Sequence, residues 1–183
     1  MQQAVFLDRD GTLIEEHGYI REMSKVAFYP ETVDALQRLK ERFKLFIVTN
    51  QSGVGEEIIT LADVKRINGY VTEYLAEHGI QIIQVYVCPH SRNDECSCRK
   101  PNPYFLYQAA EEHNIDLAGS YVIGDHPSDV ELAENAGAHG IYLLTGHGSK
   151  HRKELSYEVF VELGIQQAAE YILRSSPTPW FST

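Results

Sequence analysis

Five short apolar runs, separated by stretches of helical periodicity, constrain the fold of this chain more than any other feature. The runs are rich in Val, Ile, Phe and Tyr and show little polar alternation, as is typical of strands covered on both faces. They occupy residues 4–7, 44–48, 82–87, 121–123 and 140–144. Since helical patterns fill the gaps, the sequence predicts a three-layer, Rossmann-like α/β fold with a mostly parallel central sheet and right-handed crossovers.

Capping residues define the expected helices. Pro30 starts a helix that runs to Leu39, because proline is well tolerated in a first helical turn. Thr60 and Asp63 form a capping pair for a second helix, and Gly79 ends it. Further helices are expected over residues 103–113, 128–136 and about 166–173, with a short element at 159–161.

The length and composition fit one globular domain. The 183 residues are 43% hydrophobic, which suits a single folded core and is too apolar for a disordered chain. We expect this domain over residues 1–175, followed by a C-terminal tail over 176–183 that contains Trp180 and Phe181. The sequence has no apolar run long enough to span a bilayer and no signal-peptide pattern, so we expect a cytoplasmic protein without a membrane partner. Heptads are absent, and we expect a monomer.

The net charge counts against one class of partner. With 16 Lys and Arg residues against 26 Asp and Glu residues, the chain carries a formal charge of −10. Such a surplus repels polyanions and offers no face that neutralises phosphates, so we expect no nucleic-acid partner. A small phosphorylated substrate would need a metal ion or a local basic pocket.

Polar side chains gather where the predicted strands end. Asp8 and Asp10 follow the first strand, and Gly11 allows a sharp turn after them. Alone, this D-x-D-G pattern is typical of a turn or of part of a calcium loop. Because the carboxyl ends of parallel strands meet at one edge of a sheet, further polar groups at such ends can converge with it. These groups are residues 49–52, 99–100, and 124–125 with 129.

Four motifs of the chain resemble those of a known superfamily. DRDGT, TNQSG, CRKP and GDHPSD, in this order and spacing, resemble the motifs of the haloacid dehalogenase (HAD) superfamily of aspartyl-phosphate phosphatases. The resemblance covers about residues 4–148, which is most of the chain. It implies a HAD fold and a Mg²⁺-dependent phosphomonoester hydrolase that acts on a small phosphorylated sugar or polyol through an aspartyl-phosphate intermediate.

The same resemblance implies a role for each motif residue. Asp8 matches the nucleophile, and Asp10 matches the general acid and base, whose main-chain carbonyl is also a metal ligand in such enzymes. Asp125, with Asp129, would complete an oxygen-only Mg²⁺ site together with Asp8. The residues expected to bind the phosphate or the rest of the substrate at these motifs are Thr49, Asn50, Gln51, Arg99 and Lys100.

All three cysteines of the chain lie in one loop. Cys88, Cys96 and Cys98, together with His90, form C-x-H and C-x-C pairs spaced for tetrahedral Zn²⁺. The alternative is three unconnected thiols beside a chance histidine, but four ligand-type residues so tightly clustered favour zinc. Since all four positions would be protein ligands, the ion would be structural and would fix the loop that precedes the Arg99–Lys100 pair.

The cysteine loop narrows the resemblance to one subgroup of the superfamily. A C-x-H…C-x-C clamp before RKP is similar to the subgroup of heptose bisphosphate phosphatases and histidinol-phosphate phosphatases. His17, Gly18 and Tyr19 resemble a substrate-bordering HGY stretch of the heptose enzymes, and we expect that substrate class on this ground. The five-residue zinc spacer and GDHPSDVELAENAG, with His126 where heptose enzymes often carry Lys, resemble the histidinol-phosphate enzymes, which keeps that alternative open.

The spacing of the motifs leaves no room for a cap domain. Only 41 residues separate Asp8 from Thr49, and one loop and one helix use them up. We therefore expect a capless, open site roofed by loops near residues 17–23, 53–59 and 88–98. An open site also admits a polynucleotide 3′-phosphatase, but the chain has no basic stripe with interleaved aromatic residues. A zinc-bearing scaffold without activity is the remaining alternative, and the presence of both Asp8 and Asp10 argues against it.

Overall fold

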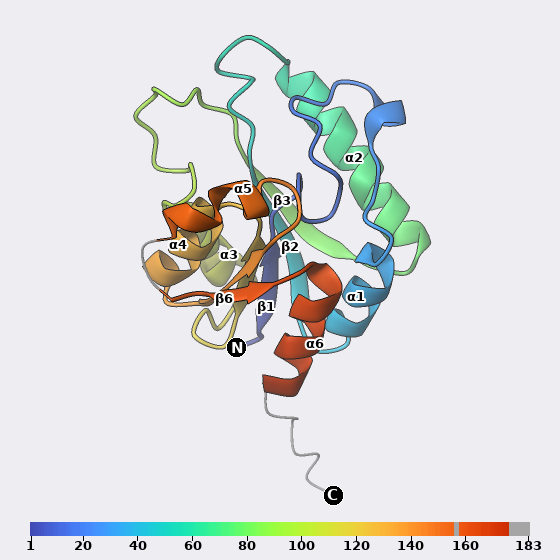
Figure 1. Ribbon diagram of the computed structural model, residues 1–183, viewed down its shortest axis with the longest axis vertical. Helices are drawn as coiled ribbons and strands as arrows, with labels where there is room; N and C mark the ends of the chain where they lie inside the picture. Colours follow the sequence, from blue (N-terminus) through green and yellow to red (C-terminus); the bar gives the residue numbers. More distant parts are fainter. Residues whose placement is uncertain (156–157, 176–183) are drawn as a thin grey trace, which may run out of the picture.

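The computed structural model describes residues 1–155 and 158–175, which form three layers (Figure 1). The strands are β1 (Ala4–Leu7), β2 (Lys44–Asn50), β3 (Ile82–Cys88), β4 (Tyr121–Gly124), β5 (His139–Leu143) and β6 (Phe160–Glu162). The α-helices are α1 (Thr32–Leu39), α2 (Leu61–Glu77), α3 (Tyr104–His113), α4 (Pro127–Ala136), α5 (Gly148–His151) and α6 (Ile165–Ser175). Two short 3-10 turns are η1 (Met23–Lys25) and η2 (Arg152–Glu154).

The strands form a single sheet in the order β3-β2-β1-β4-β5-β6, and every neighbouring pair is parallel. Chain order therefore reverses between β1 and β4, where Leu7 lies beside Ile47 on one side and Ile123 on the other. In open parallel sheets of this kind, ligands bind beyond the carboxyl ends of the strands at such a reversal. The fold confirms the predicted α/β class and directs attention to the ends of β1 and β4.

Alternate residues of each buried strand build two hydrophobic cores. Val5 and Leu7 of β1 pack in the core that also contains residues of α1, α2 and α6. Ala4 and Phe6 face the opposite way, into the core shared with α3 and α4. Figure 1 shows these two helix layers on either side of the sheet. The apolar runs lack polar alternation because both faces of the strands are covered.

The structure moves some of the predicted boundaries. Pro30 lies outside α1, which begins at Thr32 with Glu31 as its N-cap, so the prediction of proline in the first turn was wrong. Proline does occupy a first turn in α4, where Pro127 follows the N-cap residue His126. The short element predicted at 159–161 overlaps β6, a strand that pairs with β5. The predicted tail at residues 176–183 lies outside the described residues.

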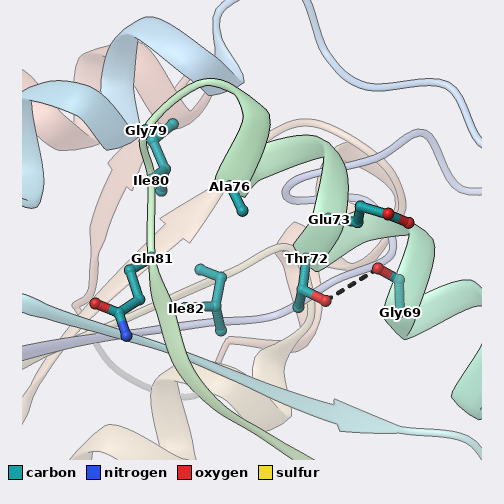
Figure 2. Close-up of a pocket in the computed structure, with 8 residues that line it drawn as sticks. All are labelled: Gly69, Thr72, Glu73, Ala76, Gly79, Ile80, Gln81 and Ile82. Carbon is teal, nitrogen blue, oxygen red and sulfur yellow. Dashed lines mark hydrogen bonds between the residues drawn. The ribbon is translucent and has the colours of Figure 1, made fainter.

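A surface groove of about 750 Å³ lies between the second half of α2 and the start of β3 (Figure 2). Gly69, Thr72 and Ala76 line its helix side, and Gly79 to Ile82 line the other. Since β3 begins here, the groove lies at the amino ends of the strands, away from the β1/β4 reversal. Across residues 1–155 and 158–175, no helix is long and apolar enough to cross a membrane.

The N-terminus of α2 carries the predicted capping box, which gives stability a pH dependence. The Thr60 hydroxyl and backbone N–H donate to Asp63, and with Arg66 they lower the pKa of Asp63 from its ordinary value of 3.8 to about 2. A group with a lower pKa in the folded state stabilises the fold above its unfolded pKa and loses this contribution as pH falls through the folded value.

We predict that Asp63→Asn lowers the free energy of unfolding at pH 6, and that the gap to the native protein shrinks as pH falls from about 4 to about 2. Urea unfolding at several pH values measures this gap. Glu73→Gln, which removes a carboxylate in the middle of the same helix, is the control and should show no such convergence. A gap for Asp63→Asn that stays constant down to pH 2 would contradict the prediction.

Candidate active site

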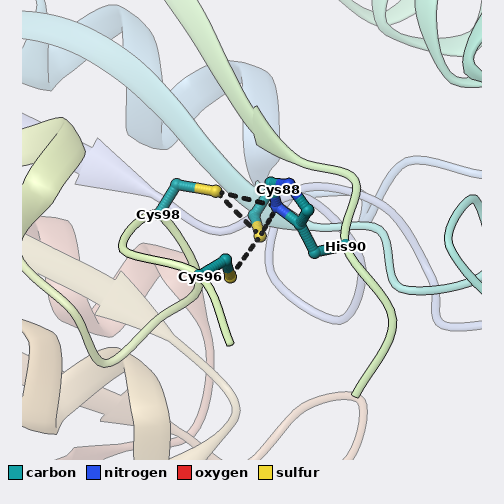
Figure 3. Close-up of side chains that lie close together, drawn as sticks. All are labelled: Cys88, His90, Cys96 and Cys98. Carbon is teal, nitrogen blue, oxygen red and sulfur yellow. Dashed lines mark hydrogen bonds between the residues drawn. The ribbon is translucent and has the colours of Figure 1, made fainter. Parts of the chain in front are cut away.

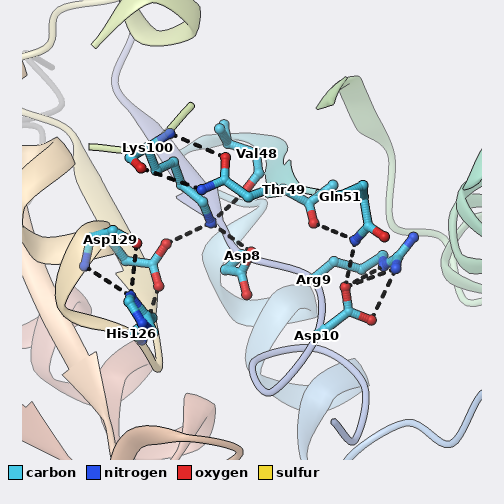
Figure 4. A network of polar contacts seen from close by, with 11 residues as sticks. Asp8, Arg9, Asp10, Val48, Thr49, Gln51, Lys100, His126 and Asp129 are labelled. Atoms are coloured by element: carbon cyan, nitrogen blue, oxygen red, sulfur yellow. Dashed lines mark hydrogen bonds and ion pairs between the residues drawn. The ribbon is translucent and has the colours of Figure 1, made fainter. Parts of the chain in front are cut away.

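Lys100 bridges two carboxylates at the reversal point of the sheet (Figure 4). Its Nζ lies 2.6 Å from an oxygen of Asp8, which follows β1, and 2.6 Å from an oxygen of Asp129 on α4. It also donates to the carbonyl of Val48 at 2.9 Å. Burial alone would lower the pKa of Lys100, but Asp129 and Asp8 raise it above its ordinary value, so the lysine stays charged.

A third carboxylate, Asp125 at the end of β4, lies beside this bridge. Carboxylate oxygens of Asp8, Asp125 and Asp129 all lie within 4.8 Å of one another. Burial raises the pKa of Asp8 and of Asp125, and the nearby carboxylates raise both further. Gly11, with a φ of +84°, makes this crowding possible, because a Cβ there would lie 2.1 Å from an Asp125 oxygen.

The side chains after β2 are held by protein groups. Asn50 accepts a hydrogen bond from the backbone N–H of Lys100 at 3.1 Å and donates to the Lys100 carbonyl at 3.4 Å. Gln51 donates through Nε2 to the Thr49 hydroxyl at 2.9 Å and to Asp10 at 2.8 Å. Gln51 thus connects Thr49 with Asp10, whereas Asn50 fixes the backbone that carries Lys100.

Asp10 makes a second, separate set of contacts. Its carboxylate accepts from Nε and Nη2 of the buried Arg9, each at 3.0 Å. The remaining guanidinium nitrogen, Nη1, donates to Asn68 of α2 at 2.7 Å. Neither Arg9 nor Asn68 is among the site residues predicted from the sequence. One signal was available for Asn68, which is a polar residue on the buried, otherwise apolar stripe of α2.

The four predicted zinc ligands converge at the end of β3 (Figure 3). The sulfur of Cys88 lies 3.1 Å from that of Cys98, 3.7 Å from that of Cys96 and 3.5 Å from Nδ1 of His90. The four ligand atoms lie within 4.8 Å of one another. In a tetrahedral zinc site with bonds of about 2.0–2.3 Å, neighbouring ligand atoms lie roughly 3.3–3.8 Å apart, so this geometry fits zinc.

Arg99 contacts the cysteine loop, residues 88–98. Its guanidinium donates to the carbonyls of Arg92 and His90 at 2.9 and 3.2 Å. Next to it, Gly55 of the loop after β2 donates its backbone N–H to Pro89 at 2.8 Å. The cysteine loop is thereby connected to the β2 loop, defined here as residues 51–59.

The HGY stretch docks on the same β2 loop through its tyrosine. The Tyr19 hydroxyl donates to Glu56 at 3.1 Å and lies 3.0 Å from the Ser52 hydroxyl. Its ring lies against Gly53, where a Cβ would come within 2.6 Å of a ring carbon. His17, in contrast, is about half exposed and pairs with Glu15 at 3.1 Å. Three loops from distant parts of the sequence therefore support one another beside the carboxylate cluster.

Two further groups lie near these carboxylates, the backbone of His147 and the side chain of Glu16. The backbone N–H of His147 donates to Asp125 at 2.7 Å, so the segment after β5 borders the site. Glu16 accepts from the backbone N–H of Gly18 at 2.5 Å, and burial, followed by the nearby Asp10, raises its pKa.

The parallel sheet, the Asp8–Lys100–Asp129 bridge and Asp125 at the reversal point define a HAD-type hydrolase. A family model described as HAD-hydrolase-like matches residues 97–165. A D-glycero-β-D-manno-heptose-1,7-bisphosphate 7-phosphatase from Yersinia pestis is 40% identical over 144 residues, which cover 73% of this chain and 77% of that relative. The enzyme of the same name from Pasteurella multocida is 36% identical over 185 residues, which cover 96% of this chain and 93% of that relative.

A solved structure agrees with these relatives. It is a D,D-heptose 1,7-bisphosphate phosphatase from B. bronchiseptica, complexed with magnesium and phosphate. It superimposes with a TM-score of 0.87 at 27% identity and covers 94% of this chain and 99% of its own. The chain therefore belongs to the D-glycero-D-manno-heptose 1,7-bisphosphate 7-phosphatase family of HAD-like hydrolases, and it is a phosphatase.

The docking of Tyr19 predicts a measurable effect on substrate binding. Tyr19→Phe removes two hydrogen bonds that hold the HGY stretch on the β2 loop, each with a net worth of about 0.5–1.5 kcal/mol. Their sum of roughly 1–3 kcal/mol corresponds to about fivefold to 150-fold in an equilibrium constant. We expect kcat/KM for a sugar phosphate to fall by about tenfold and the rate with p-nitrophenyl phosphate, which lacks a sugar, to change little. Tyr104→Phe, at a tyrosine that is 49% exposed on α3, is the matched control. Equal losses on both substrates would contradict a role limited to the sugar side.

Proposed function

We propose that this protein hydrolyses the 7-phosphate of D-glycero-D-manno-heptose 1,7-bisphosphate through an aspartyl-phosphate on Asp8. The observation that carries the proposal is the Lys100 bridge between Asp8 and Asp129, in a chain whose relatives bear the name of this activity. The bridge holds a carboxylate nucleophile and a fixed positive charge side by side. A phosphoryl group placed there would meet both the attacking atom and the charge that neutralises it.

In the first step, an oxygen of Asp8 attacks the phosphorus. Lys100 holds this carboxylate in place and shares its charge with the incoming phosphoryl oxygens. The Thr49 hydroxyl accepts from Gln51 and keeps its own proton, which it can donate to the same oxygens. Asn50 supports the step indirectly, because it fixes the backbone of Lys100.

Asp10 serves as the general acid and then as the general base. It gives a proton to the departing sugar oxygen, and it later takes one from the water that attacks the aspartyl-phosphate. Its contacts through Gln51 to Thr49 support a position beside the reacting phosphoryl group.

The carboxylate cluster fits Mg²⁺. Mg²⁺ prefers oxygen ligands, and Asp8, Asp125 and Asp129 each offer a carboxylate oxygen within 4.8 Å of the others. Burial, and after it the neighbouring carboxylates, raises the pKa values of Asp8 and Asp125, and a bound cation would stabilise the charged form of both groups. Asp8, Asp125, the carbonyl of Asp10 and Asp129 would hold the ion, which when bound neutralises charge on the phosphate.

The sulfur and nitrogen geometry of Cys88, His90, Cys96 and Cys98 supports structural Zn²⁺. Burial raises the pKa of the Cys88 thiol to about 12, whereas at Cys96, although burial raises the pKa, N–H groups of Arg99 and Cys98 lower it below the ordinary value. Metal bound here would favour the thiolate form of every cysteine in the cluster. With four protein ligands it would have no open position, and its effect would be to fix the segment that carries Arg99 and Lys100.

The HGY stretch, Arg99 and the cysteine loop are proposed to border the sugar and its second phosphate. The formal charge of −10 supports a small phosphate ester over nucleic acid as the substrate. Three cysteines without a disulfide support a reducing, cytoplasmic location, and we propose that the protein acts there as a monomer.

Steady-state kinetics with two substrates tests the proposed function. We expect kcat/KM for the heptose bisphosphate to exceed that for histidinol phosphate by at least about a hundredfold, since unpaired polar groups make sites reject substrates that lack a partner group. Omission of Mg²⁺ should abolish turnover of both. A preference for histidinol phosphate would overturn the substrate assignment, and Mg²⁺-independent turnover would overturn the metal role.

Metal analysis tests the zinc site independently of activity. Protein purified without chelator should contain about one zinc per chain, and removal of zinc should lower the free energy of unfolding. His90→Ala should weaken zinc retention, whereas His139→Ala, at an exposed histidine at the start of β5, should leave it unchanged. Purified protein that contains no zinc would contradict the assignment.

A further inference from the structure

Arg9 is a buried cation to which the proposed reaction assigns no role. It lies between the nucleophile Asp8 and the acid Asp10 in sequence, and it is only 1% exposed. Its Nε and Nη2 donate to the two oxygens of Asp10, as Figure 4 shows. A bidentate ion pair of this kind fixes the plane of a carboxylate as well as its position.

Asn68 anchors this pair to the rigid part of the fold. Its side-chain oxygen accepts from Nη1 of Arg9 at 2.7 Å, and the residue is 7% exposed on the buried face of α2. A buried guanidinium must have its N–H groups paired. Because Asn68 is neutral, it satisfies one of them without competing with Asp10 for the charge of Arg9.

The two carboxylate oxygens of Asp10 differ in how many further hydrogen bonds they can accept. Oδ2 accepts from Nε of Arg9 and from Nε2 of Gln51, and Nη2 of Arg9 also lies 2.8 Å from it. Oδ1 accepts only from Nη2 of Arg9, among the hydrogen bonds of the described residues. Each carboxylate oxygen has two acceptor positions, so Oδ1 keeps one of them open.

From this geometry we infer that Arg9 and Asn68 are positioning residues for proton transfer, and that Oδ1 of Asp10 is the atom that carries the proton. The inference rests on the proposed phosphatase mechanism. In the first half-reaction the proton leaves Oδ1 for the ester oxygen, while the ester P–O bond breaks and the bond from Asp8 to phosphorus forms. Arg9 stabilises the carboxylate that results.

In the second half-reaction, Oδ1 takes a proton from water as the water oxygen bonds to phosphorus and the bond to Asp8 breaks. The products are the alcohol and inorganic phosphate, and both aspartates return to their starting states. Arg9 and Asn68 touch neither substrate nor phosphate in this scheme, since they act through Asp10.

The dependence of rate on the leaving group tests this inference. A sugar alkoxide leaves slowly without a proton, whereas p-nitrophenolate leaves without one, so only the sugar ester needs a well-placed acid. We expect Arg9→Lys and Asn68→Ala each to lower kcat/KM for the heptose bisphosphate by roughly tenfold to a hundredfold, and kcat/KM for p-nitrophenyl phosphate by less than about threefold. Because both esters share the second half-reaction, kcat should fall for both.

Lys65→Ala, on the exposed side of α2, is the control and should leave both values unchanged. Asn68→Ala keeps the Arg9–Asp10 pair and is the second variant if Arg9→Lys does not fold. Equal losses of kcat/KM on the two esters, or no loss on either, would overturn the inference while leaving the phosphatase assignment intact. Native protein that hydrolyses neither ester would overturn the proposed function itself.

Discussion

The rest of the structure depends on the buried contact of Lys100 with Asp8 and Asp129. Removal of these charges from water is unfavourable, and their attraction offsets this cost only where the geometry is close and the remaining polar groups are paired. The carbonyl of Val48 and the N–H of His126 supply that pairing. The ends of β1 and β2 and the start of α4 must therefore meet at one point, which fixes how the middle of the sheet is assembled.

The Lys100 bridge also explains why an acidic chain can accept a phosphate ester. The three neighbouring carboxylates outnumber the single lysine, so the cluster retains negative charge that favours a divalent cation. Lys100 arrives at this point from the cysteine loop, with Cys98 only two residues before it. The order of that loop and the charge balance at Asp8 therefore depend on one short segment.

Sequence patterns predicted the strands and the convergence of the motifs because buried parallel strands are continuously apolar and their carboxyl ends share one edge. They did not predict which polar atoms pair within that edge. Arg9 and Asn68 are 59 residues apart, and Asn50 clamps a backbone 50 residues away. Such pairs depend on how α2 and the cysteine loop pack. Pro30 shows that a local preference does not fix a helix boundary. Proline is tolerated in a first helical turn, but α1 begins after Pro30, whereas Pro127 does occupy the first turn of α4.

The most direct test of the account is detection of the phosphoryl group on Asp8. The protein would be mixed with substrate and Mg²⁺, quenched in acid within the first turnovers, digested and analysed by mass spectrometry. The account predicts one phosphoryl group on Asp8, absent from the Asp8→Asn variant, which should also be inactive. Normal turnover by Asp8→Asn, or a phosphoryl group found on another residue, would contradict it.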